Sequence, residues 1–183
     1  MTLDSAGFGG TRSLIRQIVE IGDPVLRSVS SPVENPCSTE VRELARDMAD
    51  TLKDFQRRTG YGRGIAAPQV GTPVRMIVVD MPELDGIATL VNPRVTSRSP
   101  EMFDVWDACF SYFYLFFVVE RHRAITVEYQ DLHGALNVIE ASGNLSELLQ
   151  HEIEHLEGEL AIDKVKDPRT FCTVREFEKR VRK

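Results

Sequence analysis

His151 and His155 form the pattern in this chain that most directly suggests chemistry. Residues four apart lie on one face of an α-helix, roughly 5–6 Å apart at Cβ, so both imidazoles can reach a single metal ion. Glu152, three residues before His155, shares their side of the helix and can take a proton from a water molecule at such an ion. The spacing therefore predicts a metal-dependent hydrolase in which Glu152 is the acid/base.

The residues around this trio favour a functional role for Glu152. The carboxylate falls in line with an apolar stripe on the same helix, which consists of Leu145, Leu148, Leu149, Leu156 and Leu160. A carboxylate on a buried stripe is strongly disfavoured unless something compensates its charge, and a divalent cation would do so. The alternative is a charged surface helix that carries two histidines by chance, and the stripe weighs against it.

Two histidines need a third protein ligand. Three acidic residues follow the pair, as in zinc proteases, at Glu157, Glu159 and Asp163. Gly158 is expected to end the helix and to change the direction of these side chains. Cys109 is the better candidate, although a lone buried cysteine is usually only a small hydrophobe. A zinc endopeptidase remains an alternative if the third ligand lies after the second histidine.

Helical periodicity places two of the elements that would position these residues. Apolar residues recur at helical spacing from Ser38 or Thr39 until just before Gly60. The helix with the histidines is expected to run from residue 144 to 156 or 157. Asn144 and Glu147 have the spacing of a capping box at its start.

The remaining elements are strand-like. Four β-rich segments are predicted at 74–80, 87–91, 124–130 and 135–141. A turn at 131–134 joins the last two into a hairpin, and a short helix follows Thr173. Strands that cluster between helices, without βαβ alternation, predict an α+β fold with a largely antiparallel sheet.

The chain is expected to form a single domain over residues 18–183, because it shows neither an internal repeat nor an interior linker. A flexible arm rich in glycine, serine and threonine is predicted at residues 1–17.

Composition excludes several classes of function. The formal net charge of −6 argues against non-specific binding to nucleic acid. No segment approaches the roughly 18 consecutive apolar residues of a membrane-spanning helix. The N-terminus lacks the basic and apolar regions of a secretory signal, and the three cysteines are odd in number. A cytoplasmic protein without disulfides is therefore expected.

Three segments, in this order, resemble the peptide deformylase family. Residues 62–69 (GRGIAAPQ) match its GxGxAAxQ motif, residues 107–111 (DACFS) stand in the place of EGCLS, and residues 150–155 (QHEIEH) match QHExxH. The resemblance spans roughly residues 18–177. It implies an α+β fold of mixed, mostly antiparallel strands around a central metal-binding helix. It also implies removal of the formyl group from N-formyl-methionyl peptides, with release of formate.

The resemblance implies a ligand set and a cofactor. Cys109, His151 and His155 would bind one ion, natively Fe²⁺ and often Zn²⁺ or Ni²⁺ in purified samples, with a fourth position left for water. The ion would lower the pKa of that water toward 7. Glu152 would accept the proton and later deliver it to the leaving amine.

The first two motifs imply further site residues. The side-chain amide of Gln69 and the backbone N–H of Phe110 resemble the donors that stabilise the oxyanion in this family. Glycines such as Gly62 and Gly64 can also suggest a phosphate-binding loop, but the segment follows a helix and lacks the Lys-Ser/Thr of such a loop. Missing side chains would instead let a substrate lie close, so Gly62, Gly64 and Ile65 are expected to bind substrate.

The second motif departs from the family at Asp107, Ala108 and Phe110, and an aromatic run continues to Phe117. This run is expected either to border the substrate pocket or to pack in the core or an interface. Two alternatives therefore stay open, which are hydrolysis of another N-formyl or N-acyl substrate and a non-catalytic relative that binds metal or peptide. The chain retains all five side chains that the chemistry needs, and this argues against a non-catalytic relative. They are Gln69, Cys109, His151, Glu152 and His155.

Overall fold

The strands form two antiparallel sheets. The computed structural model describes residues 14–181, and within this range one sheet has the order β1-β2-β3-β6-β7 and the other β4-β5-β8. The strands of the first sheet are β1 (Gly64–Ala66), β2 (Met76–Met81), β3 (Gly86–Arg98), β6 (Ala124–Gln130) and β7 (Leu136–Ser142). Those of the second are β4 (Met102–Asp107), β5 (Leu115–His122) and β8 (Cys172–Thr173).

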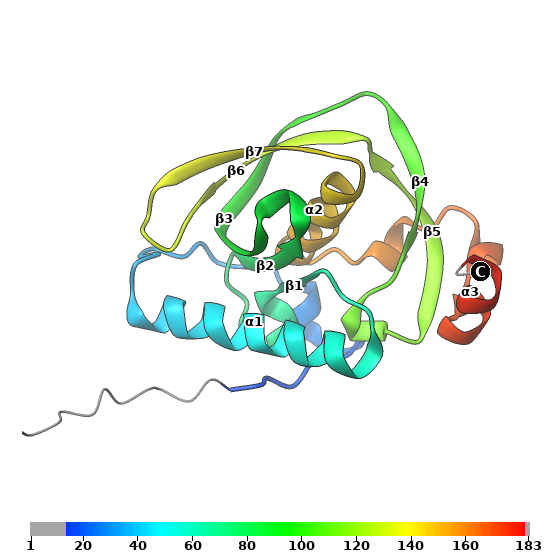
Figure 1. Cartoon of the computed structure of the whole chain (residues 1–183), viewed down its shortest axis with the longest axis horizontal. Coiled ribbons are helices and arrows are strands. Elements are labelled where there is room, and N and C mark those ends of the chain that lie inside the picture. The colour runs from blue at the N-terminus through cyan, green and yellow to red at the C-terminus, as the bar shows by residue number, and fades with distance from the viewer. Residues whose placement is uncertain (1–13, 182–183) are drawn as a thin grey trace, which may run out of the picture.

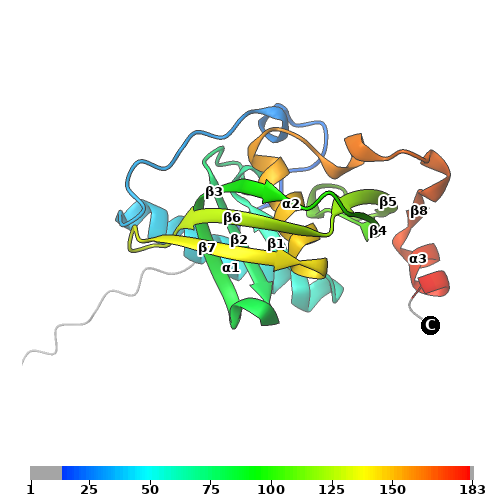
Figure 2. The ribbon, with the colours of Figure 1, turned by 90° about the horizontal axis from the view of Figure 1, so that it is seen from above.

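The helices lie on the faces and at the edge of these sheets. They are α1 (Thr39–Thr59), α2 (Gly143–Leu156) and α3 (Val174–Val181). Figures 1 and 2 show α2 at the centre, with the five-stranded sheet on one side and β4 and β5 on the other. This arrangement confirms the predicted α+β fold around a central helix, although the strands divide into two sheets.

Side-chain alternation along β2 explains why two helices sandwich the larger sheet. Ile77 and Val79 belong to the core cluster that contains the apolar side chains of α2. Met76 and Val78 point to the other face and pack in the cluster that contains those of α1. Because successive side chains of a strand point to opposite faces, the four consecutive apolar residues that begin β2 are covered on both sides.

The first predicted helix is confirmed, and its ends follow from ordinary capping. Ser38 accepts a hydrogen bond from the backbone N–H of Val41. Gly60 ends the helix in the left-handed conformation, with φ of 75°, and its N–H bonds to the carbonyl of Gln56. Glycine adopts this conformation without the steric cost that other residues have.

The predicted capping box of α2 is wrong. The helix begins one residue earlier, at Gly143, and follows directly from β7. Ser142 is its N-cap and makes no side-chain capping bond, while Asn144 lies inside the helix. Glu147 forms an ion pair with Arg63 of the neighbouring segment instead of turning back to its own helix. Tertiary contact has here replaced the local capping bond.

The predicted arm lies mostly outside the described residues, and its boundary stays a prediction. The described part of the arm, residues 14–17, lies alongside α1 and is hydrogen-bonded to it. The backbone N–H of Leu14 bonds to Asp47 over 2.8 Å, and that of Arg16 bonds to Thr51 over 2.8 Å. None of the helices in residues 14–181 is long and apolar enough to cross a membrane.

Candidate metal and catalytic site

The fold brings Cys109, His151 and His155 together. Cys109 lies two residues after the end of β4, and η4 (Phe110–Tyr112), a single 3₁₀ turn, begins directly after it. The histidines lie on successive turns of α2. The ligand atoms of the three residues all lie within 4.8 Å of one another, and all three residues are buried. The Cys109 Sγ and His155 Nε2 atoms are 3.2 Å apart. The structure thus brings together the three residues that the family resemblance implies as ligands.

The donor set fits a single divalent transition-metal ion. One sulfur and two imidazole nitrogens suit iron, zinc or nickel better than magnesium or calcium, which prefer oxygen. Burial holds the pKa of His155 well below its ordinary value, so that its ring is neutral. Neutral imidazole is the form that binds metal.

A buried ion-pair network orients His151. Its Nδ1 atom lies 2.9 Å from Asp107 Oδ1, which leaves Nε2 for the ion. Arg121 bonds to the other oxygen of Asp107 over 2.8 Å and to Glu154 over 2.5 Å. Burial favours a higher pKa for Asp107, but the charges and hydrogen bonds of His151 and Arg121 outweigh it and hold the pKa well below its usual range. A carboxylate behind a metal-binding histidine fixes its ring and makes it a stronger ligand.

Sequence reasoning missed Arg121, because it lies on β5 at no fixed spacing from either motif. A charged side chain that is 1% exposed needs partners on both sides, and Arg121 has them in Asp107 and Glu154. No signal in the sequence singles it out, because Glu120 and His122 flank it at the polar end of β5.

Glu152 lies beneath the glycine segment of the first motif. Its side chain is buried, and Oε2 has no hydrogen-bond partner among the described residues. A Cβ atom built on Gly64 would lie 2.5 Å from Glu152 Oε1, so only glycine leaves room for the carboxylate there. Burial raises the pKa of Glu152 to about 7. A carboxyl group with a pKa near neutrality is suited to accept and return a proton.

Gln69 is held with its amide directed at the site. The backbone N–H of Ala66 donates to Gln69 Oε1 over 2.8 Å, which orients the amide. Gln69 Nε2 donates to Cys109 Sγ over 3.2 Å. The ring of Phe110 stacks on Phe55 with centroids 3.8 Å apart. This stacking helps to hold the backbone of Phe110 beside Cys109.

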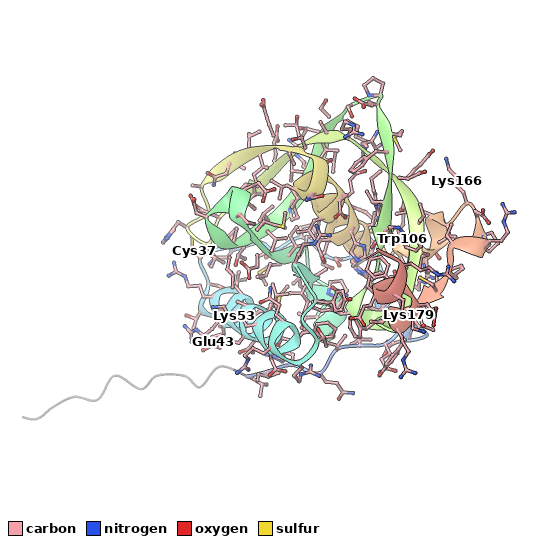
Figure 3. All side chains as sticks on the ribbon, turned by 45° about the vertical axis from the view of Figure 1, so that its right-hand side comes forward. Cys37, Glu43, Lys53, Trp106, Lys166 and Lys179 are labelled. Carbon is pink, nitrogen blue, oxygen red and sulfur yellow. The ribbon has the colours of Figure 1, made fainter. Side chains whose placement is uncertain are left out.

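A cavity of about 120 Å³ opens beside these groups, and its lining includes Glu152, Cys109 and Gln69. One part of its wall is aromatic and comprises Tyr61, Trp106, Phe110, Phe113 and Phe116. Figure 3 shows Trp106 beside α3, where its ring is 5.4 Å from that of Phe177.

Two of the three residues that were predicted to bind substrate line this cavity. Gly62 and Gly64 line it, as the substrate-binding prediction requires. Ile65 does not, because its side chain is fully buried in the core beside α1. Any contact of Ile65 with a substrate would therefore come from its backbone in β1.

The comparisons with known proteins agree with this geometry. A family model for polypeptide deformylase matches residues 15–171. The peptide deformylase of Rhizobium meliloti (strain 1021) is 39% identical over 168 residues, which cover 90% of this chain and 93% of the relative. That of Bartonella quintana (strain Toulouse) is 36% identical over 171 residues, with coverage of 92% and 94%.

Solved structures show the same fold. The crystal structure of peptide deformylase from Thermotoga maritima is 31% identical, with a TM-score of 0.77, and the match covers 84% of this chain and 99% of that one. A peptide deformylase from Synechococcus elongatus in complex with actinonin is 30% identical, also with a TM-score of 0.77, and the coverage is 87% and 85%. Motifs, fold and donor set therefore agree, and the chain belongs to the peptide deformylase family.

Proposed function

We propose that this chain removes the formyl group from N-formyl peptides in the cytoplasm, with one ion held by Cys109, His151 and His155 and with Glu152 as the acid/base. One observation carries the proposal. The three ligand atoms lie within 4.8 Å of one another, and the buried carboxylate of Glu152, on the same helix, lines the same cavity as Cys109 and His151.

An ion held by these three residues would act as a Lewis acid and would make water acidic enough to supply hydroxide near neutral pH. Glu152, whose pKa is about 7, takes up the proton of the attacking water at its carboxylate. It then returns that proton to the nitrogen of the leaving amine. The C–N bond of the formamide breaks, and the products are formate and a free amino terminus.

Two neutral donors complete the proposed site. Gln69 Nε2 and the backbone N–H of Phe110 would donate hydrogen bonds to the oxygen of the formyl group as it gains negative charge. Preorganised donors of this kind are each worth about 10²–10³-fold in turnover. The bond from Ala66 to Gln69 supports this role, since it turns the NH₂ group, not the carbonyl, toward the site.

The ion that works in the cell is proposed to be Fe²⁺. A thiolate with two imidazoles also accepts Zn²⁺ or Ni²⁺, so the donor set alone does not select among them. Activity is expected to decay in air when Fe²⁺ is bound, because the ion or the Cys109 thiolate oxidises. Equal half-lives with and without oxygen would favour zinc or nickel as the native ion.

The proposal is tested by measuring formate release from formyl-Met-Ala-Ser by protein purified anaerobically and loaded in turn with each ion. Acetyl-Met-Ala-Ser is the matched control, since it differs from the substrate only in its acyl group. Formate release without acetate release supports the proposal. Comparable release of acetate would indicate a general N-acyl hydrolase. Full metal binding without turnover of any formyl peptide would indicate a non-catalytic relative.

A further inference from the structure

The cavity beside the catalytic groups contains an ion pair that the proposed reaction does not use. Arg63, between the two glycines of the first motif, pairs with Glu147, which lies one helical turn before His151. Both residues line the cavity. The side chain of Glu147 is 7% exposed and that of Arg63 is 43% exposed. Glu147 is therefore buried in the cavity wall, whereas Arg63 belongs to the wall and is also partly open to solvent.

The position of this pair determines which part of a substrate it meets. Glu152 and Cys109 mark the place of the formyl group, and Arg63 precedes Gly64, under which the Glu152 carboxylate lies. The side chain nearest to the formyl amide is that of the first residue of the peptide. A first side chain that enters the cavity beside the reacting group would meet the ion pair, because Arg63 and Glu147 both line it.

An ion pair in the wall disfavours a purely apolar side chain. Methionine in this cavity would displace water from Arg63 and Glu147 and would return no hydrogen bonds. Arg63 keeps guanidinium N–H groups beyond the one that Glu147 accepts, and the carboxylate of Glu147 can accept further bonds. A side-chain amide satisfies both partners, because its carbonyl accepts from Arg63 and its NH₂ group donates to Glu147.

A charged side chain fits this wall less well than an amide. A carboxylate would meet Arg63 but be repelled by Glu147, and an ammonium group would meet Glu147 but be repelled by Arg63. We propose that the Arg63–Glu147 pair selects the first residue of the substrate and favours a neutral amide side chain, glutamine or asparagine, over methionine. This inference rests on the proposed deformylase function and specifies its substrate.

Steady-state kinetics on a panel of formyl-X-Ala-Ser peptides, with X as Gln, Asn, Met, Glu or Lys, tests the selection directly. The value of kcat/KM for glutamine is expected to exceed that for methionine by at least about tenfold, since a site built for hydrogen bonds rejects analogues that lack them. Binding of the unformylated X-Ala-Ser peptides gives a second readout that needs no catalysis. Trp106 is the single tryptophan of the chain and lines the cavity, so its fluorescence reports this binding.

Charge-removal variants separate selection by the pair from a purely structural role. Arg63→Leu leaves Glu147 unpaired and is expected to shift preference to lysine. Glu147→Leu leaves Arg63 unpaired and is expected to shift the substrate preference to glutamate. If Glu147→Leu folds poorly, Glu147→Gln replaces it in the test. The double leucine variant should prefer methionine. The matched control removes the exposed cross-strand pair of Arg94 and Glu128, by changing both to glutamine, and should keep the parental ranking.

Preference of the parent for methionine in both assays overturns the inference, and so does an unchanged ranking in the double leucine variant. Absence of formate from every peptide would instead contradict the proposed function. In that case the ranking by Trp106 fluorescence still decides whether the ion pair selects an amide side chain.

Discussion

Buried carboxylates dominate the site at the scale of single residues, and each has its own compensating charge. Glu147 has Arg63, and Asp107 has Arg121 and His151. Glu152 has an oxygen with no hydrogen-bond partner among the described residues, at the place where the proposed ion would supply the missing charge. The sequence identified Glu152 because it interrupts an apolar stripe.

Changing Asp107 to asparagine tests the orientation of His151. The change removes the charge behind the ligand ring and leaves Arg121 with a weaker partner. Metal affinity is expected to fall by about 10–100-fold, the usual effect of losing such a support. Competition with a chelator of known affinity measures it. Asp104→Asn is the control, because Asp104 lies exposed on the same strand, and equal affinities in the two variants would contradict the assigned role.

At the scale of elements, the sequence predicted those that carry local signals. The helix ending at Gly60 and the strands now labelled β6 and β7 were located from periodicity and from the turn between them. Strands β4 and β5 were not predicted, because no glycine or proline marks the turn between them at residues 108–114. Their pairing depends on contacts distant in sequence, such as Met102 with His122.

The end of α2 offers a test of close packing at an element boundary. Gly158 adopts a φ of 73°, and a Cβ atom there would lie 2.5 Å from the carbonyl oxygen of Arg27. Gly60 has a similar φ of 75° with nothing within 4 Å. Gly60→Ala should therefore cost only the left-handed conformation, about 1–2 kcal/mol, while Gly158→Ala should cost clearly more. Urea unfolding of both variants measures the difference, and equal losses would refute the packing argument.

At the scale of the whole molecule, the proposed ion joins the two sheets. Cys109 follows β4 in one sheet, whereas α2, with the histidines, packs on the other. The sequence could predict that Cys109, His151 and His155 lie close together, because all three residue types are ligands of transition-metal ions. The Arg63–Glu147 pair could not be predicted, since neither residue belongs to the invariant part of a motif and local spacing suggested a capping role for Glu147.

Metal removal is expected to lower the melting temperature. A ligand present at 100 times its Kd stabilises the folded state by about 2.7 kcal/mol, and chelation removes this contribution. Calorimetry with and without a chelator measures the shift. Cys172→Ser should retain the shift, because Cys172 is outside the ligand group, and Cys109→Ser should reduce it. An equal shift in both variants would exclude Cys109 as a ligand.

The central claim is that Cys109, His151 and His155 hold the ion while Glu152 moves the proton. The most direct test measures metal content and formate release together in Glu152→Gln, with Glu157→Gln, an exposed carboxylate beyond the helix end, as the control. The account predicts that Glu152→Gln keeps a full equivalent of metal but loses at least ~10²-fold in turnover, while the control keeps both. Loss of metal from Glu152→Gln would make Glu152 a ligand, and near-parental turnover would contradict its role as the acid/base.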